Sequence, residues 1–393
     1  MVPRGRRGGR GRFHTHLPSV AVPLPTPDQY RAMIDAARSG SYAYPAVNVS
    51  SSETLNAAVR GFSAARSDGI VQITTGAAAY LSGQSDDMAV GARAFAEFAH
   101  TIVARAPVFI ALHTDHCTPE NADRFLRPLL RVSRLRRRRG REPLFNSHMF
   151  DGSQLSLREN LRLSAELLRE AHELGILLEL EIGIVGGEED GVDNGRAPLE
   201  RRFSTPADAV AVAEALGLGE RGRYLLAATF GNSHGRSVVG ETRLRPELLA
   251  DLQRAVMCGR VGGRLDFVFH GGSGSGAEDI RVAIANGVVK VNVDTDMQYA
   301  FTRAVETHFR YRPIVGRVSR GPVDKRIYDP RAWGRKAELN MATRIVEICR
   351  ELGSANRSTV DGHRSRGRRR GRVARTHAPG PGTRRVPRGL RGS

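Results

Sequence analysis

The feature that most constrains this chain is a regular alternation of short apolar runs with longer amphipathic stretches between about residues 26 and 353. Runs rich in β-branched or other apolar residues predict strands. They lie at 44–49, 70–74, 107–112, 143–147, 176–182, 224–230, 266–270 and 288–293. Helices are predicted between them, at 53–67, 86–105, 119–132, 158–174, 206–217, 246–257 and 276–286. Eight such units predict the α/β class and a closed (β/α)8 TIM barrel rather than an open sheet.

The basic residues mark the limits of this body. The chain has 393 residues and a formal charge of +19, and its arginines are concentrated in 1–25, 131–142 and 354–393. The first and last of these segments are rich in Gly, Pro and Arg, so they cannot bury enough apolar surface to offset their ordering entropy. We therefore predict a disordered basic tail at 1–25, a barrel domain with C-terminal helices at 26–353, and a second disordered tail at 354–393. The segment 131–142 is predicted as a loop, and a further helix is predicted at about 329–352, packed outside the barrel.

The arginine-rich tails raise the question of nucleic acid, because phosphate backbones attract such segments by counterion release. However, only three of the 60 basic residues are lysines, and this bias holds along the whole chain. No aromatic residue lies in 354–393 to stack on bases. Nucleic-acid binding by the tails is therefore kept as an alternative and is not the partner that we expect.

Apolar runs, cysteine spacing and the N-terminal segment indicate the cellular compartment. No run of about 18 apolar residues occurs, so no membrane partner is expected. The three cysteines, Cys117, Cys258 and Cys349, are widely spaced. They exclude a disulfide framework and suit a reducing compartment. The first apolar segment is short and interrupted by proline, unlike the core of a signal peptide. We therefore expect a cytoplasmic protein.

Histidines follow three of the predicted strands. The third strand ends in HTDHC (113–117), the sixth in FGNSHG (230–235) and the seventh in HGGSGSG (270–276). In a barrel of this type the carboxyl ends of the strands meet at one face, where active sites lie. Imidazoles from separate strands are typical ligands of a catalytic zinc that keeps one position open. His116, His234 and His270 are therefore candidate zinc ligands.

Acidic residues gather at the same predicted face. Asp115 adjoins His116, Asp151 follows the fourth strand, and Glu179 and Glu181 share one face of the fifth strand. The segment GGEEDG (186–191) places three acids between glycines, which suits a lid that delivers a base.

Glycine-rich and polar turns follow the last two predicted strands. HGGSGSG and NVDT (292–295) suit a phosphate site, because glycine lets backbone N–H groups approach an anion at a helix N-terminus. Metal, carboxylates and phosphate site together indicate proton abstraction next to a carbonyl. P-loop and CxxC motifs are absent, so Walker-type ATP hydrolysis and a thioredoxin-like centre lack support.

These motifs resemble those of the class II, metal-dependent fructose-bisphosphate aldolases. The resemblance covers about 26–353, and its longest motifs are ALHTDHC, FNSHMFDGS, ELEIGIVGGEEDGVDN, YLLAATFGNSHG, FVFHGGSGS, VVKVNVDTDMQYAFTR and YDPRAWGRKAE. It is closest to the longer-chain branch, in which helices follow the barrel. The resemblance implies reversible cleavage of fructose 1,6-bisphosphate to dihydroxyacetone phosphate and glyceraldehyde 3-phosphate, through a zinc-stabilised enediolate, in glycolysis and gluconeogenesis.

The resemblance also implies roles for single residues, carried over by motif. His116, His234 and His270 match the zinc ligands, and Asp151 and Glu181 match ligands of a second divalent ion. Asp115 matches the acid/base at the C4 hydroxyl. Glu189 matches the base on the dihydroxyacetone-phosphate carbon, with Glu188 as the second choice, and Asn292 matches the amide that orients the enediolate.

Substrate contacts are implied in the same way. They are Asn48, Thr74, Gly235, Gly271, Gly272, Ser273, Asn292, Val293, Asp294 and Thr295. Arg331 in YDPR matches the clamp on the second phosphate, which in this family can come from the other subunit of a dimer. The resemblance therefore implies a homodimer.

Two segments depart from the family pattern. ITTGAA (73–78) places Thr74 where the family has serine, and the loop after His234 lacks the usual Lys and Pro, near the phosphate and a monovalent-cation site. Two alternatives therefore stay open. One is an aldolase for another ketose bisphosphate, such as tagatose 1,6-bisphosphate. The other is an inactive aldolase-like scaffold that binds nucleic acid through its tails.

Overall fold

Eight parallel strands close into a barrel in the order β1-β10-β9-β8-β5-β4-β3-β2, which confirms the predicted TIM-barrel fold. The computed structural model describes residues 24–189, 192–194, 198–233, 243–310 and 325–360. The barrel strands are β1 (Tyr44–Asn48), β2 (Gly69–Thr74), β3 (Ile110–Cys117), β4 (Ser147–Phe150), β5 (Leu177–Ile182), β8 (Tyr224–Ala228), β9 (Phe267–Phe269) and β10 (Val288–Val293). A separate hairpin pairs β6 (Glu188–Glu189) with β7 (Val192–Asp193).

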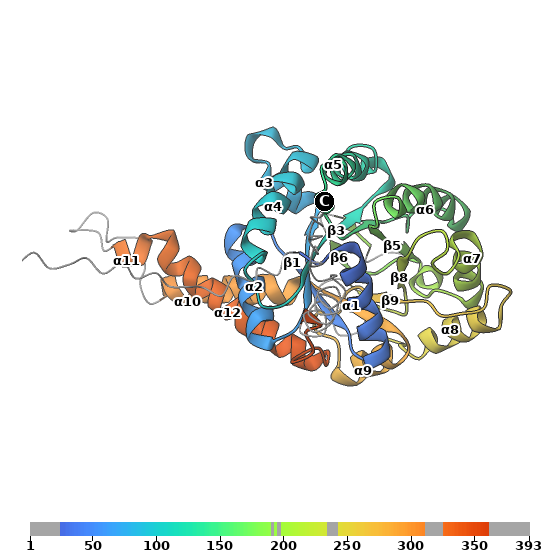
Figure 1. Cartoon of the computed structure of the whole chain (residues 1–393). Helices are drawn as coiled ribbons and strands as arrows, with labels where there is room; N and C mark the ends of the chain where they lie inside the picture. Colours follow the sequence, from blue (N-terminus) through green and yellow to red (C-terminus); the bar gives the residue numbers. More distant parts are fainter. Residues whose placement is uncertain (1–23, 190–191, 195–197, 234–242, 311–324, 361–393) are drawn as a thin grey trace, which may run out of the picture.

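Helices surround this barrel (Figure 1). They are α1 (Pro27–Gly40), α2 (Ser52–Ala65), α3 (Thr75–Leu81), α4 (Met88–Val103), α5 (Leu126–Arg138), α6 (Leu157–His172), α7 (Pro206–Leu216), α8 (Leu248–Cys258), α9 (Ala277–Ala285), α10 (Thr295–Arg310), α11 (Lys325–Tyr328) and α12 (Pro330–Glu351). Several begin at capping boxes, in which the side chains of Thr26, Ser51 and Thr205 accept hydrogen bonds from the N–H group three residues later. Within the described residues, no helix combines the length and apolarity needed to cross a bilayer.

The amino-terminal end of the barrel is apolar and closed. Helix α1, which the sequence analysis did not predict, buries Tyr30, Met33 and Ile34 completely. These side chains form one cluster with inward-facing strand residues such as Ala111 and Leu177. Because side chains alternate along a strand, residues two and four positions further along β3 and β5 also face inward, at the other end of the barrel. There the inward residues are polar, which places the candidate site at the carboxyl ends of the strands.

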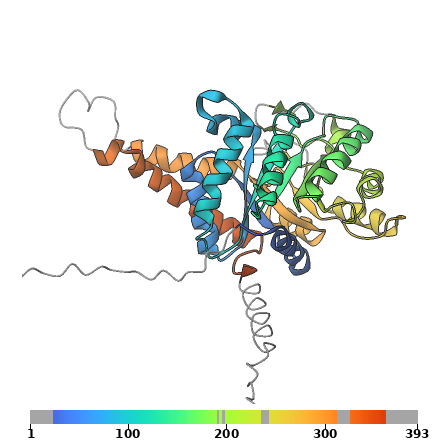
Figure 2. The same ribbon diagram turned by 45° about the horizontal axis from the view of Figure 1, so that its top comes forward.

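Helices α10, α11 and α12 form an arm that extends away from the barrel, and Figure 2 shows the same arm from a second direction. Helix α12 confirms the predicted helix at 329–352. It packs along α2, where Gly61 lies against Ile345 so closely that a Cβ on the glycine would come within 2.7 Å of it. The Arg60 guanidinium also donates to Glu338 on α12 at 2.9 Å.

Two predicted strands are displaced. The third is predicted at 107–112, but β3 covers 110–117 and ends with HTDHC. The prediction of a strand at 143–147 is wrong, because β4 covers 147–150. The apolar pair before it is buried in a loop that Asn146 holds, through hydrogen bonds with the Leu112 N–H at 2.9 Å and the Pro25 carbonyl at 2.7 Å.

The basic segments also differ from expectation. Most of the predicted loop 131–142 lies in helix α5, which buries Leu126, Leu129 and Leu130. Arg131, Arg137 and Arg138 are exposed, whereas Arg136 is buried and pairs with Glu97 at 2.6 Å. Arginine is a good helix former, so a run of arginines does not interrupt the helix. The body also extends beyond 353, since Ser354 and Val360 are buried and the Asp68 carboxylate accepts hydrogen bonds from Thr359. The tail predictions for 1–23 and 361–393 lie outside the described residues.

Candidate active site

An irregularity in β3 brings two neighbouring side chains into one site. The register between β3 and β4 shifts between Thr114 and Cys117, and His116 has a φ of +39°. On a regular strand Asp115 and His116 would point to opposite faces. A bulge re-aims side chains at such a point. Asp115 keeps the inward direction of the regular strand and is buried inside the barrel, whereas the bulge brings His116, whose side chain is 10 % exposed, to the mouth.

Two histidines from different strands face each other at this mouth. His116 Nε2 and His270 Nδ1 are 3.0 Å apart. The outer nitrogen of each ring lies next to a carboxylate: His116 Nδ1 is 3.0 Å from Asp151, and His270 Nε2 is 2.8 Å from Glu179. Such carboxylates fix the ring orientation and tautomer of metal-ligating histidines. The structure therefore brings together two of the three predicted zinc ligands with their inner nitrogens converging.

The protonation of this pair follows from burial and hydrogen bonding. Burial lowers the pKa of His270, which keeps the ring neutral at neutral pH. Burial by itself raises the pKa of Asp151, but hydrogen bonds with His116 and Ser153 outweigh it and lower the pKa of the carboxyl to about 2. A neutral imidazole and an ionised carboxylate are the forms that bind a metal cation.

The donor set fits a divalent cation. Ligand atoms of Asp115, His116 and His270 lie within 4.8 Å of one another, and so do those of His116, Asp151 and Glu181. Imidazole nitrogens and carboxylate oxygens are ligands that zinc prefers. His234 lies outside the described residues, directly after Ser233, and so does the predicted contact Gly235.

Asp115 accepts hydrogen bonds from three amides. Gln72 Nε2 lies 2.7 Å from its carboxylate, and the Nδ2 atoms of Asn48 and Asn292 each lie 3.2 Å away. Amide N–H groups only donate, so they stabilise the ionised form that accepts a proton. The structure thus gathers the predicted acid/base Asp115 with the predicted contacts Asn48 and Asn292.

Sequence reasoning missed several residues of the barrel interior. Gln72, His113 and Lys290 are completely buried next to the predicted set, and Glu179, which was noted on the fifth strand, received no role there. Burial raises the pKa of Glu179, but the Lys290 ammonium and the neighbouring histidines lower it further and hold it well below its usual range. The available signal was one charged residue inside the apolar run VVKVNV.

The turn after β9 has the shape of the predicted phosphate site. Gly271 has a φ of +68°, and a Cβ there would collide with the Ser233 carbonyl oxygen. Ser273 is buried, and its hydroxyl accepts from the Asp296 N–H at 3.4 Å in the first turn of α10. Helix α10 begins at Thr295, directly after β10. The predicted contacts Gly271, Gly272, Ser273, Asp294 and Thr295 therefore lie around one helix N-terminus, which favours an anion.

Thr74 and Asp294 line a neighbouring cavity of about 410 Å³, together with Asn48. The Thr74 hydroxyl accepts a hydrogen bond from the Ala77 N–H at 3.1 Å and caps helix α3. The Thr74 hydroxyl, which the serine of the family also provides, thus has a structural role at the start of α3 besides its predicted contact with substrate.

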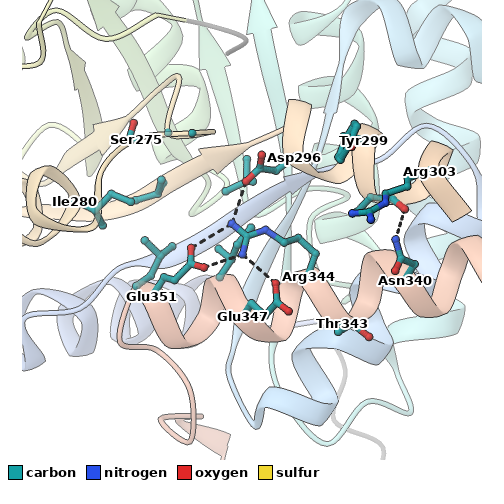
Figure 3. Close-up of a pocket in the computed structure, with 17 residues that line it drawn as sticks. Ser275, Ile280, Asp296, Tyr299, Arg303, Asn340, Thr343, Arg344, Glu347 and Glu351 are labelled. Carbon is teal, nitrogen blue, oxygen red and sulfur yellow. Dashed lines mark hydrogen bonds and ion pairs between the residues drawn. The ribbon is translucent and has the colours of Figure 1, made fainter. Parts of the chain in front are cut away.

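A second cavity, of about 510 Å³, lies between the turn after β9 and helices α10 and α12, and the predicted contact Val293 lines it (Figure 3). Its most prominent cation is Arg344, which Figure 3 shows directed at three carboxylates. They belong to Asp296, Glu347 and Glu351, at 3.1, 3.1 and 2.7 Å. Because both terminal nitrogens of its guanidinium contact carboxylates, we interpret this cluster as a link between helices α10 and α12, not an anion site.

Three predicted residues remain: Glu188, Glu189 and Arg331. Glu188 and Glu189 form β6, and the Gly186 N–H just before it donates to the Asn232 carbonyl at 3.1 Å. Arg331 lies in the first turn of α12, has a side chain that is 91 % exposed, and pairs with Asp329 at 2.6 Å. Helix α12 begins beside α11 on the projecting arm (Figure 1), and Arg331 is the second residue of α12.

Comparisons with known proteins agree with this geometry. The profile of the family described as "Fructose-bisphosphate aldolase class-II" matches residues 28–357. A fructose-bisphosphate aldolase of Streptomyces galbus is 54 % identical over 338 residues, which cover 85 % of this chain and 98 % of the relative. One from Mycobacterium leprae is 48 % identical over 345 residues, covering 86 % and 99 %. The crystal structure of a fructose-bisphosphate aldolase from Campylobacter jejuni matches with a TM-score of 0.74 and 31 % identity, covering 86 % of this chain and 98 % of that chain.

Proposed function

This chain belongs to the class II fructose-bisphosphate aldolases, and we propose that it performs their reaction with the residues described above. The reaction is the reversible aldol cleavage of fructose 1,6-bisphosphate to dihydroxyacetone phosphate and glyceraldehyde 3-phosphate, which makes the protein a carbon–carbon lyase. The observation that carries this assignment of residues is the convergence of His116, His270 and Asp115 beside the glycine turn after β9.

We propose that His116, His234 and His270 hold a catalytic zinc ion, and that Asp151 and Glu181 serve a second divalent position. When bound, zinc polarises the ketose carbonyl and stabilises negative charge on the enediolate. The carboxylates beside the outer nitrogens of His116 and His270 support this role, because they leave the inner nitrogens to face the metal.

The proton transfers belong to side chains of this chain. In cleavage, Asp115 accepts the proton of the C4 hydroxyl, the C3–C4 bond breaks, and its electron pair remains on the three-carbon fragment as the enediolate. Glu189, or Glu188 as the second choice, then delivers a proton to that carbon. Asn292 donates to the enediolate from a position 3.2 Å from Asp115. The three amides around Asp115 support its role, since they hold it ionised and aimed into the barrel.

Different residues bind the two phosphate groups of the substrate. Gly235, Gly271, Gly272 and Ser273, with Asp294 and Thr295, receive the phosphate of the dihydroxyacetone half, and a monovalent cation binds beside the loop after His234. Arg331 receives the second phosphate in the site of the partner subunit of a homodimer. Its exposure on the arm supports this role. We place the enzyme in the cytoplasm.

The assignment is tested by cleavage of fructose 1,6-bisphosphate, with tagatose 1,6-bisphosphate measured in parallel. Asp115→Asn and His116→Ala are expected to lower kcat at least about 100-fold, because each removes a group that acts in the transition state. A chelator is expected to abolish wild-type activity, and added zinc to restore it.

The matched control is Asp266→Asn. Asp266 is buried but lies just before β9, at the opposite end of the barrel, so its loss is expected to leave kcat unchanged. Near-normal turnover of the Asp115 or His116 variant would contradict the assignment. A higher kcat/KM for tagatose 1,6-bisphosphate than for fructose 1,6-bisphosphate would change the assigned substrate but leave the proposed mechanism in place.

A further inference from the structure

Beneath the histidine pair, a lysine and a glutamate lie completely buried against each other. Lys290 Nζ is 3.0 Å from Glu179 Oε1 and 2.9 Å from Glu179 Oε2. Both side chains are 0 % exposed. A buried ion pair is weak evidence for stability, because desolvation offsets most of the attraction, so a pair in this position calls for another explanation.

Each member of the pair also contacts one residue of the proposed site. Glu179 Oε1 accepts from His270 Nε2 at 2.8 Å, on the side of the ring that faces away from His116. Lys290 Nζ donates to Asn292 Oδ1 at 2.6 Å. The pair therefore lies directly behind two groups from different strands.

These two contacts fix the orientation of both groups. A carboxylate only accepts, so His270 must carry its proton on Nε2 and present the lone pair of Nδ1 toward His116. An ammonium group only donates, so the oxygen of Asn292 must face Lys290. The amide nitrogen of Asn292 then faces Asp115, as observed at 3.2 Å.

We propose that Glu179 and Lys290 act as positioning residues, with Glu179 setting the tautomer of His270 and Lys290 setting the amide orientation of Asn292. This inference rests on the proposed function, in which His270 is a zinc ligand and Asn292 orients the enediolate. Neither residue contacts the reacting atoms. Their effect is to orient the His270 ring toward the proposed zinc position and the Asn292 amide nitrogen toward Asp115.

The test uses three variants of the full chain and measures zinc affinity by competition with a chromogenic chelator, kcat and KM at saturating zinc, and Tm. In Glu179→Gln the new amide meets the Lys290 ammonium in either orientation, because both carboxylate oxygens lie within 3.0 Å of Nζ. Zinc affinity is expected to fall between ten- and a hundredfold. In Lys290→Met, kcat is expected to fall about tenfold with KM changed less than threefold, since Asn292 loses its fixed orientation.

The double variant E179Q/K290M distinguishes positioning from simple stabilisation. Without the lysine, the oxygen of the new amide is free to accept from His270, so zinc affinity is expected to recover relative to Glu179→Gln, while kcat stays low. A matched control is the ion pair Arg223–Asp266, at 2.8 Å near the other end of the barrel. Arg223→Met is expected to lower Tm and leave zinc affinity and kcat unchanged.

Zinc affinity and kcat within twofold of wild type in both single variants, with Tm lowered as in the control, would overturn the proposal. If Glu179→Gln does not fold, the double variant and Lys290→Met decide the question by the same two readouts. Failure of the proposed function gives a different result: wild-type protein that binds zinc but does not cleave the substrate. In that case zinc affinity alone still tests the role of Glu179.

Discussion

At the scale of single residues, burial decides which groups of the barrel carry charge. His148 on β4 is 1 % exposed, and its Nδ1 lies 2.8 Å from the Thr114 hydroxyl. Burial lowers the pKa of His148 to about 3, well below the value of 6.5 for an exposed imidazole. The folded protein therefore holds this ring neutral across a range of pH in which the unfolded chain binds a proton.

This difference predicts an acid-sensitive stability. Because the unfolded state binds the extra proton between pH 6.5 and about 3, the free energy of unfolding falls as the pH is lowered through that window. The slope from one such group is about 1.4 kcal/mol per pH unit. We expect His148→Gln, whose side chain retains a hydrogen bond to Thr114, to show a shallower decline than wild type in urea unfolding between pH 7 and 5. Equal slopes for the two proteins would contradict this account.

At the scale of elements, backbone irregularities shape the site. The bulge in β3 turns His116 toward the mouth above the inward-facing Asp115, and the turn after β9 brings its backbone against Ser233. Both features use backbone angles that most residues disfavour, at points where a regular strand would have aimed the side chains elsewhere. The local chain geometry at these two points is therefore part of the functional design of the barrel.

The turn after β9 offers a matched pair of substitutions. Gly271 and Gly274 both have positive φ, at +68° and +80°, but a Cβ collides with Ser233 only at Gly271 and has open space at Gly274. We expect Gly271→Ala to raise KM for the substrate at least about tenfold, because the turn must shift away from the phosphate. Gly274→Ala is expected to cost only about 1 kcal/mol of stability, since the strain is confined to the backbone. Steady-state kinetics with urea unfolding checks both, and an equal KM for the two variants would argue against the phosphate role.

At the scale of the whole molecule, the arm of α10, α11 and α12 matters most. The arm projects from the barrel (Figures 1 and 2), and Arg331, in the first turn of α12, has a side chain that is 91 % exposed, which suits a residue that completes the site of a partner. Symmetric dimers exchange such contacts reciprocally, so each subunit would both give and receive one arginine.

Mixing of inactive subunits tests this exchange. In a dimer of one Asp115→Asn subunit and one Arg331→Ala subunit, the second subunit keeps Asp115 and receives the arginine of the first. An equal mixture that reassociates freely is expected to recover about a quarter of wild-type activity, since half of the dimers are mixed and each has one complete site. Activity no higher than that of the separate variants would place Arg331 in its own subunit's site or outside the reaction.

The arginine-rich ends are the second question at this scale. The matching family profile covers residues 28–357, so most of both tails lies outside it. We expect a chain trimmed to 24–360 to retain kcat and KM, because every described contact of the site lies within those limits. The same trimming decides the nucleic-acid alternative: binding of RNA or DNA by the full chain that falls steeply with salt and disappears in the trimmed chain would support it. Loss of activity on trimming would show that the tails serve the barrel itself.

What the sequence by itself determined is the part that depends on local pattern. Alternating and helical periodicity of apolar residues identified seven of the eight barrel strands and the helix at 330–351, because burial of one face imposes that period on neighbouring residues. The motifs around His116, Asp115 and the glycine turn indicated the family, because their functional residues lie in a few consecutive positions. The strand prediction at 143–147 was wrong, because hydrogen bonds of the Asn146 side chain hold that segment as a loop before β4.

Only the tertiary structure decided which distant residues share a contact. Glu179, His270 and Lys290 come from β5, the end of β9 and β10, and their meeting depends on closure of the barrel and on the register of its strands. The same holds for α1, whose apolar face closes the barrel end, and for α10, α11 and α12, which form the projecting arm. A local pattern states which face of an element is buried, but the identity of the partner across the barrel follows from packing of the whole chain, which no local period encodes.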